Sequence, residues 1–320
     1  LYGALLAGVD TVIMGAGIPL EIPGALDRLA EHQPASLAVA IAGDEPGSEV
    51  RTRFDPATVV QGLAPLDRPR FLAIISAVSL AQVLVRRANG RVDGFIVEAP
   101  TAGGHNAPPR GAPTFDELGQ PVYGPRDEVD LDKLRALGLP FWLAGGRGGP
   151  GELEAARAHG AAGIQVGTAF AFCRESGLDP ELRRRAIDAV MAGSARVVTD
   201  PLASPTGFPF KVVELAGTLS DPDVYAGRER VCNLGYLAET YRRPDGAVGY
   251  RCPAEPVAKY VAKGGRAEET VGRKCLCNGL VANLGLSGAP RGAGAAERPL
   301  LTAGDDLASV AHCVGEAGVD

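Results

Sequence analysis

The residue types best suited to chemistry lie in a loop that follows an apolar stretch. His105 comes after Gly103 and Gly104, and this glycine pair follows closely on the apolar residues 94–97 (GFIV). Two glycines let a backbone approach a flat ligand closely, because no Cβ stands in the way. An imidazole, whose ordinary pKa is about 6.5, can accept a proton at neutral pH. We interpret His105 as a general base at a ligand site, with an ordinary loop histidine as the alternative.

Two further glycine-containing turns end consecutive apolar segments. The residues of these turns are Gly145, Gly146, Gln165, Val166, Gly167 and Thr168. Backbone N–H groups in such turns bind anions, and barrel enzymes bind phosphate on the loops after their last two strands. The two turns therefore predict an anion site, and a pair of tight turns without a ligand is the alternative.

A group of thiols lies in the last third of the chain. Its members are Cys232, Cys252, Cys275 and Cys277. Four thiols could hold zinc or an iron–sulfur cluster, but their spacing matches no standard ligand motif. The cationic neighbours Arg273 and Lys274 would lower a thiol pKa and would favour a redox role. We interpret these cysteines as buried structural residues and assign no metal ligands.

The elements that must position these residues alternate along the chain. The expected strands are residues 9–14, 71–76, 92–97, 141–144 and 164–166, and the expected helices are residues 1–7, 22–30, 80–87, 131–137, 152–159 and 180–192. Apolar strands alternating with helices are typical of a parallel sheet covered by helices. We predict an α/β fold of the TIM-type (β/α) barrel class, with a doubly wound sheet as the alternative.

The barrel predicted from the sequence is incomplete. Five strands are expected where a complete barrel has about eight, and the chain starts at Leu1 without a methionine. We therefore expect the first units to be missing and the natural chain to begin earlier. The predicted division is a barrel portion at residues 1–215, with an insertion at 34–54. A C-terminal extension or lid follows at 216–320, where helical and irregular segments mix with the cysteines.

Composition excludes several classes of protein. The 320 residues are 46% hydrophobic and 22% charged, which is typical of a folded globular protein and not of a disordered chain. The net charge of −6 argues against a nucleic-acid partner. No apolar stretch reaches the roughly 18 residues of a membrane span, and no secretory signal is visible. We expect a cytoplasmic protein with reduced thiols, and a homo-oligomer stays open.

Three motifs together carry a family resemblance: AGGH at residues 102–105, AGG at 144–146 and QVGT at 165–168. Each follows a predicted strand, and the combination resembles the nitronate monooxygenase family over about residues 8–215. The chain departs from the family where Gln-Gly-x-Glu usually precedes the glycines, because Glu98 and Pro-Thr stand there. The family's Asn and Gln flavin ligands from early strands have no counterpart either.

The resemblance implies a barrel that binds FMN. It implies that Gly103 and Gly104 lie beside the flavin and that His105 is the catalytic base. It further implies that the phosphate and ribityl chain are held by Gly145, Gly146, Gln165, Val166, Gly167 and Thr168.

The resemblance also implies a reaction. We expect an FMN-dependent oxidoreductase that oxidises alkyl nitronates, and nitroalkanes, with O2 as the second small-molecule reactant. An FMN-dependent enoyl reductase using NAD(P)H shares the GGH motif and is the alternative enzyme. A thiolate-metal binding protein is the alternative outside enzymes. An inosine-monophosphate dehydrogenase is excluded, because no cysteine lies between Glu98 and Cys173 to act as its nucleophile.

Overall fold

The chain forms two compact units that interleave along the sequence. The computed structural model describes residues 1–15, 17–44, 50–287 and 296–315. The first unit is Leu1–Glu98, Glu128–Leu143 and Glu154–Ile164, and the second is Ala99–Asp127, Ala144–Leu153 and Gln165–Asp320. Several connections thus pass from one unit to the other, whereas a division at residue 215 follows chain order and stays a prediction.

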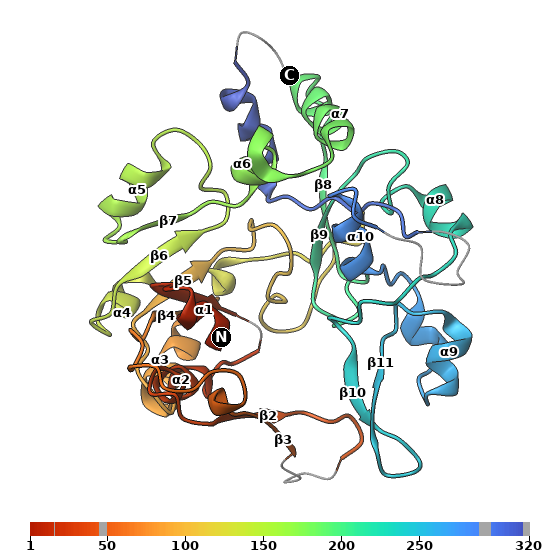
Figure 1. Ribbon diagram of the computed structural model, residues 1–320. Helices are drawn as coiled ribbons and strands as arrows, with labels where there is room; N and C mark the ends of the chain where they lie inside the picture. The colour runs from red at the N-terminus through yellow and green to blue at the C-terminus, as the bar shows by residue number, and fades with distance from the viewer. Residues whose placement is uncertain (16, 45–49, 288–295, 316–320) are drawn as a thin grey trace. The chain divides into compact units, whose positions relative to one another are not determined.

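The first unit is built on one curled sheet (Figure 1). Its strands are ordered β1-β4-β5-β6-β7. They are β1 (Thr11–Met14), β4 (Arg70–Ile75), β5 (Gly94–Glu98), β6 (Phe141–Ala144) and β7 (Gly163–Gln165). The pairs β1–β4 and β4–β5 run parallel. The expected α/β class and the five expected strands are confirmed, and the described part of the sheet corresponds to part of a (β/α) barrel.

Helices join these strands and bury apolar side chains against them. The helices are α1 (Tyr2–Leu6), α2 (Ile22–Ala30), α3 (Val78–Arg87), α4 (Leu131–Arg135) and α5 (Glu152–Ala158), with a 3₁₀ turn at Pro56–Thr58. Leu26 of α2 and Leu84 of α3 are fully buried in one core with the strand residues Phe71, Phe95 and Phe141. Full burial of such side chains stabilises a fold by about 1.5–3 kcal/mol each. All five expected helices of this unit are therefore present.

A separate strand pair lies within the expected insertion. Strand β2 (Ala35–Val39) pairs antiparallel with β3 (Val50–Phe54) and belongs to a sheet of its own. Residues 45–49 of the expected insertion lie outside the described residues. The pair adds nothing to the parallel sheet, which is compatible with an insertion, and the insertion itself stays a prediction.

The second unit combines short helices with antiparallel strand pairs. Its elements are η2 (Pro125–Asp127), α6 (Thr168–Ala171), η3 (Arg174–Ser176), α7 (Pro180–Met191), β8 (Val197–Asp200), β9 (Phe210–Val213), α8 (Pro222–Gly227), β10 (Glu239–Arg242), β11 (Val248–Arg251), α9 (Val257–Ala262), η4 (Ala267–Thr270), α10 (Leu276–Ala282) and η5 (Asp305–Cys313). Strand β8 pairs with β9 and β10 with β11. None of the helices within the described residues has the length and apolar character needed to cross a bilayer.

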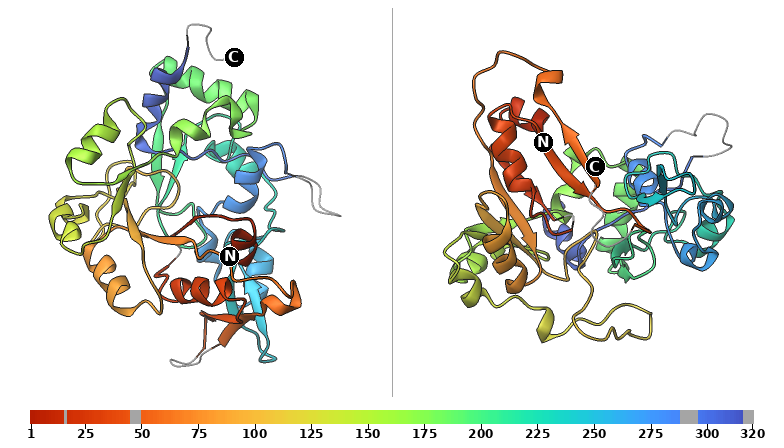
Figure 2. Two further views of the ribbon diagram at one scale, coloured as in Figure 1. Left: turned by 60° about the vertical axis from the view of Figure 1, so that its left-hand side comes forward. Right: turned by 90° about the horizontal axis from the view of Figure 1, so that it is seen from below.

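A buried segment near the C-terminus connects the parts of the second unit. We call residues 300–306 the strap. The Val213 N–H donates to the Leu301 carbonyl at 3.0 Å, and the Asp305 N–H donates to the Thr101 carbonyl at 3.0 Å. The strap continues into η5, which lies beside α7 in both views of Figure 2. Through these bonds the strap fixes β9 and the loop before His105 to one another.

We predict that Glu98, at the end of β5, makes stability depend on pH. Burial raises the pKa of its carboxyl from 4.5 to about 7. Between these values the unfolded chain releases a proton that the folded chain keeps, so stability falls as the pH rises and the loss is complete above 7. At about 1.4 kcal/mol per pKa unit the loss is roughly 3 kcal/mol. Urea unfolding at about pH 5 and about pH 8 measures this loss.

The Glu98→Gln protein should lose far less stability between these pH values than the wild type. The exposed Glu154 on α5 provides the matched control, since Glu154→Gln removes the same charge from the surface. An unchanged pH dependence in Glu98→Gln would contradict the assignment.

Candidate functional site

The loop that carries His105 is held by β9, and both belong to the second unit. The Lys211 N–H donates to the Gly104 carbonyl at 2.8 Å. His105 itself forms an isolated antiparallel bridge with Phe210. The two aromatic rings meet edge to face, with centroids 4.9 Å apart and an interplanar angle of 75°. Phe210 is buried, so the imidazole packs against a side chain that is itself held in place.

Two hydroxyl groups hold the His105 side chain. Its Nε2 lies 2.6 Å from Ser204 Oγ, which in turn lies 2.7 Å from Thr206 Oγ1. The imidazole is half-buried, and burial lowers its pKa below the ordinary 6.5. Within the described part of the chain no ion pair joins His105 to a carboxylate. The ring is therefore neutral at pH 7 and can accept a proton.

Glycine is required at positions 103 and 104 for two different structural reasons. A Cβ on Gly103 would lie 2.8 Å from the Ala303 carbonyl carbon and 2.8 Å from the Gly304 nitrogen. Gly104 has a φ of +81°, which residues with a side chain rarely adopt. The sequence analysis expected a ligand to approach the backbone closely at Gly103, but in the structure the strap occupies that place. The placement of a flavin beside these glycines stays a prediction.

The turn after β6 packs against the loop that leads to His105. Gly145 and Gly146 have φ values of +93° and +68°. A Cβ on Gly145 would lie 2.9 Å from the Ala102 nitrogen and 2.9 Å from Thr101 Oγ1. The structure therefore brings two of the three glycine motifs into direct contact, as expected for neighbouring loops of one site.

The anion donors of this site hold a carboxylate from the chain itself. Thr168 Oγ1 donates to Asp306 Oδ1 at 3.0 Å, and the Gly148 N–H donates to Asp306 Oδ2 at 3.3 Å. The Gly304 N–H donates to Thr168 Oγ1 at 3.0 Å and fixes this hydroxyl. We call these two donors, on Thr168 and Gly148, the anion cradle. It joins the loops after β6 and β7, and its use as an anion site stays a prediction.

Two unpartnered polar groups belong to the segments that carry the anion cradle and Asp306. Arg147 Nε and Ser309 Oγ are buried and lack a hydrogen-bond partner among the described residues. A Cβ on Gly148 would lie 3.5 Å from Ser309 Oγ, so this hydroxyl adjoins the cradle. Arg147 pairs with Glu152 at 2.8 Å through its terminal nitrogen. The chemical types of these donors therefore suit an anionic group such as a phosphate. Asp306 already accepts hydrogen bonds from two of them, on Thr168 and Gly148.

The remaining candidates lie in the same segment but make no comparable bond. Gln165 and Val166 are half-buried, and Gly167 is exposed directly before α6. Their assignment to the ribityl chain stays a prediction.

Sequence reasoning missed four residues of this site: Ser204, Thr206, Lys211 and Asp306. The Lys211 ammonium is buried between Thr199 Oγ1 at 2.7 Å and Asp305 Oδ1 at 2.8 Å. Ser204 lies 99 positions from His105, and Asp306 lies 138 positions from Thr168. No local spacing encodes such contacts. The only sequence signal was the Pro- and Gly-rich turn around Ser204, which marks a fixed loop without indicating its partner.

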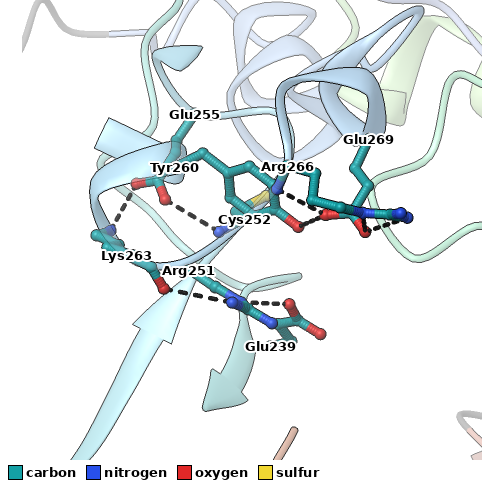
Figure 3. Close-up of polar contacts among 8 residues, drawn as sticks. All are labelled: Glu239, Arg251, Cys252, Glu255, Tyr260, Lys263, Arg266 and Glu269. Carbon is teal, nitrogen blue, oxygen red and sulfur yellow. Dashed lines mark hydrogen bonds and ion pairs between the residues drawn. The ribbon is translucent and has the colours of Figure 1, made fainter. Parts of the chain in front are cut away.

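The four cysteines Cys232, Cys252, Cys275 and Cys277 do gather into one apolar cluster. Figure 3 shows how Cys252 is fixed: Glu255 accepts its backbone N–H at 3.2 Å and pairs with Lys263 at 2.6 Å. Among the described residues no group of three or more Cys, His, Asp or Glu is arranged to hold a metal ion.

The two cationic side chains next to Cys275 in the sequence bind groups other than the thiols. Lys274 pairs with Asp200 at 2.7 Å, and Arg273 donates to the Leu202 carbonyl at 2.9 Å. A hydrogen bond with Cys252 raises the pKa of Cys232 to about 12, and a hydrogen bond with Cys232 raises that of Cys275. Burial raises the pKa of Cys277. The low pKa expected from Arg273 and Lys274 was wrong for Cys275 and Cys277, because both cations point to other acceptors. The pKa of Cys252 is lowered instead, by a hydrogen bond with Cys232.

The chain belongs to the nitronate monooxygenase family. The sequence pattern of this family, described as nitronate monooxygenase, matches residues 38–200, which is about half of the chain. The resemblance carried by the three motifs is thereby confirmed. No protein of curated function matches the chain significantly.

Several solved structures resemble the chain in fold. FabK from Thermotoga maritima is 18% identical, with 97% of this chain and 64% of FabK covered and a TM-score of 0.45. The enoyl reductase domain of MlnA from Bacillus amyloliquefaciens is 12% identical, with 98% and 71% covered and a TM-score of 0.46. Nitroalkane oxidase from Streptomyces ansochromogenes is 24% identical, with 45% and 38% covered and a TM-score of 0.33. The chain spans 54–64% of the two FabK structures.

We predict that three of the four clustered thiols resist alkylation. A raised pKa keeps Cys232, Cys275 and Cys277 protonated at pH 8, and only the thiolate reacts. Exposed Cys313 should react with iodoacetamide roughly 10²-fold faster than Cys275, as peptide mass spectrometry can measure. In denaturant all six should react alike. Equal rates for Cys275 and Cys313 in the folded protein would restore the redox interpretation.

Proposed function

We propose that this chain is an FMN-dependent oxidoreductase that oxidises alkyl nitronates, and the nitroalkanes from which they form, with O2. The observation that carries the proposal is His105, a half-buried imidazole with a lowered pKa in the glycine loop where the family's base is expected. Membership of the nitronate monooxygenase family supports the reaction class. Because the chain spans 54–64% of the FabK structures, the activity, substrate and partners of the whole protein belong to the proposal.

The residues that would hold the cofactor form two groups. Gly103 and Gly104 would lie beside the flavin ring. The phosphate and ribityl chain would be held by Gly145, Gly146, Gln165, Val166, Gly167 and Thr168. The unpartnered donors on Arg147 and Ser309 support an anionic ligand here. Bound FMN supplies a two-electron acceptor that O2 can reoxidise, and the protein supplies position and proton transfer.

His105 would take the proton from the carbon next to the nitro group. A neutral imidazole has one nitrogen that donates and one that accepts. If Nε2 keeps its hydrogen, the oxygen of Ser204 receives that bond at 2.6 Å, and Nδ1 is left as the base. The hydroxyl pair of Ser204 and Thr206 would thus select the tautomer that proton abstraction needs.

The last part of the proposal concerns the cellular compartment of the protein. All six cysteines are free thiols, which supports a reducing compartment, and we place the protein in the cytoplasm.

The first test is the cofactor and the reaction. Purified protein should be yellow, and heat denaturation should release FMN, with FAD absent from the supernatant by chromatography. Addition of an alkyl nitronate should start O2 uptake. NAD(P)H-dependent reduction of an enoyl thioester, with no uptake on nitronate, would instead establish the enoyl reductase. Protein without flavin after growth with added riboflavin would contradict both enzymes.

The second test replaces the base. His105→Asn should slow turnover of a neutral nitroalkane by roughly 10²–10⁴-fold, because a positioned general base contributes that much. Bound FMN should be retained, and oxidation of a preformed nitronate should suffer less, because that proton has already left. The wild-type rate on the nitroalkane should fall only below pH 6.5, as the lowered pKa of His105 requires.

His159→Asn, at the end of α5, is the control for loss of an imidazole. Unchanged nitroalkane turnover in His105→Asn would make His105 an ordinary loop residue. Equal losses on both substrates would make it an anion-binding group.

A further inference from the structure

The anion cradle of Thr168 and Gly148 binds both oxygens of a single carboxylate. Thr168 Oγ1 reaches Asp306 Oδ1 at 3.0 Å and the Gly148 N–H reaches Oδ2 at 3.3 Å. This bridging arrangement is the one in which two neighbouring oxygens of a phosphate would be held. A phosphate and the Asp306 carboxylate therefore need the same two donors.

The backbone around Asp306 is too firmly held to withdraw. The strap residues Leu300, Leu301 and Ala303 are buried. The Asp305 N–H donates to the Thr101 carbonyl at 3.0 Å. Thr302 Oγ1 accepts the Gly104 N–H at 2.9 Å, so the loop of His105 depends on the same segment. Only the Asp306 side chain can clear the anion cradle without breaking the strap.

The carboxylate is enclosed closely by the backbone on both sides. A Cβ on Gly304 would lie 2.6 Å from Asp306 Oδ1, and a Cβ on Gly148 would lie 3.1 Å from Oδ2. The phosphate of a flavin cannot share this space with the carboxylate. Its charge of about −2 would also repel a neighbouring carboxylate. The charge of Arg147 offers little relief, because Glu152 already pairs with it.

We propose that Asp306 is an internal competitor for the phosphate of the cofactor and sets how strongly the chain prefers a flavin with a phosphate over one without. The inference rests on the proposed function, because it concerns the site assigned there to FMN. In the ligand-free protein the Asp306 carboxylate satisfies the donors of Thr168 and Gly148. On binding of FMN the side chain must rotate away and lose both bonds.

The competition has two opposite consequences for an uncharged replacement. Asp306→Asn loses charge-assisted bonds, so the ligand-free protein should melt a few degrees lower. The same change removes the competing charge, so FMN should bind more tightly. Riboflavin, which has no phosphate, should bind equally to both proteins. A residue with a merely structural role would weaken both ligands together.

Fluorescence titration with FMN and with riboflavin tests the inference directly. In Asp306→Asn the dissociation constant of FMN should fall roughly 10-fold, as expected for hydrogen bonds to a charged group, and that of riboflavin should not change. The matched control is Asp188→Asn on α7, whose exposed carboxylate pairs with Arg184. It removes the same charge from the surface, so its ratio of FMN to riboflavin affinity should equal that of the wild type.

An unchanged ratio in Asp306→Asn, or equal tightening of both flavins, would overturn the inference while leaving the proposed function intact. If neither flavin binds any protein, the proposed function fails. The inference is then decided by inorganic phosphate alone, which should raise the melting temperature of Asp306→Asn more than that of the wild type. An equal rise in both would overturn it. Asp306→Ser takes the place of the Asn variant if circular dichroism shows that the latter does not fold.

Discussion

The geometry of the candidate site depends on one buried segment, the strap of residues 300–306. Its backbone joins Thr101, in the loop before His105, to Val213 at the end of β9. Lys211 on β9, with its ammonium almost fully buried, binds Asp305 of the same segment. A buried ammonium is tolerated only when it is paired, so this contact cannot be loosened cheaply. The strap, His105 and the glycine turns therefore form one mechanically coupled set of loops.

The elements of the first unit could be predicted from local pattern, because they follow from burial. A strand such as β6 (Phe141–Ala144) is a short apolar run that ends at Gly145, and α2 repeats its buried leucines at helical spacing. The turn after β6 could also be predicted, because Gly145 and Gly146 adopt positive φ values that favour glycine. Local pattern does not reveal why every glycine is needed. Gly103 is a glycine because the backbone of Ala303, about 200 positions away in the sequence, approaches it closely.

Charge and hydrogen-bond partners were not predictable for the same reason. Lys274 stands beside Cys275 in the sequence but binds Asp200, so sequence neighbours gave the wrong sign for the thiol pKa. His105 was found because a histidine after two glycines is a local pattern. Ser204, which fixes its ring, lies on a turn that carries no mark of its partner. Pairs separated by about a hundred residues are decided by the tertiary fold alone.

Backbone N–H groups and a hydroxyl recognise negative oxygen, and they do not distinguish a carboxylate from a phosphate by direction alone. Discrimination has to come from charge, from the number of oxygens and from what else must be desolvated. Asp306 satisfies two donors, Thr168 and Gly148, whereas Arg147 Nε and Ser309 Oγ stay without a partner among the described residues. Both oxygens of the Asp306 carboxylate are already bound, one by Thr168 and the other by Gly148. A phosphate offers a further oxygen to the surrounding donors, and we therefore expect it to compete with the carboxylate for the anion cradle while the backbone of the strap stays in place.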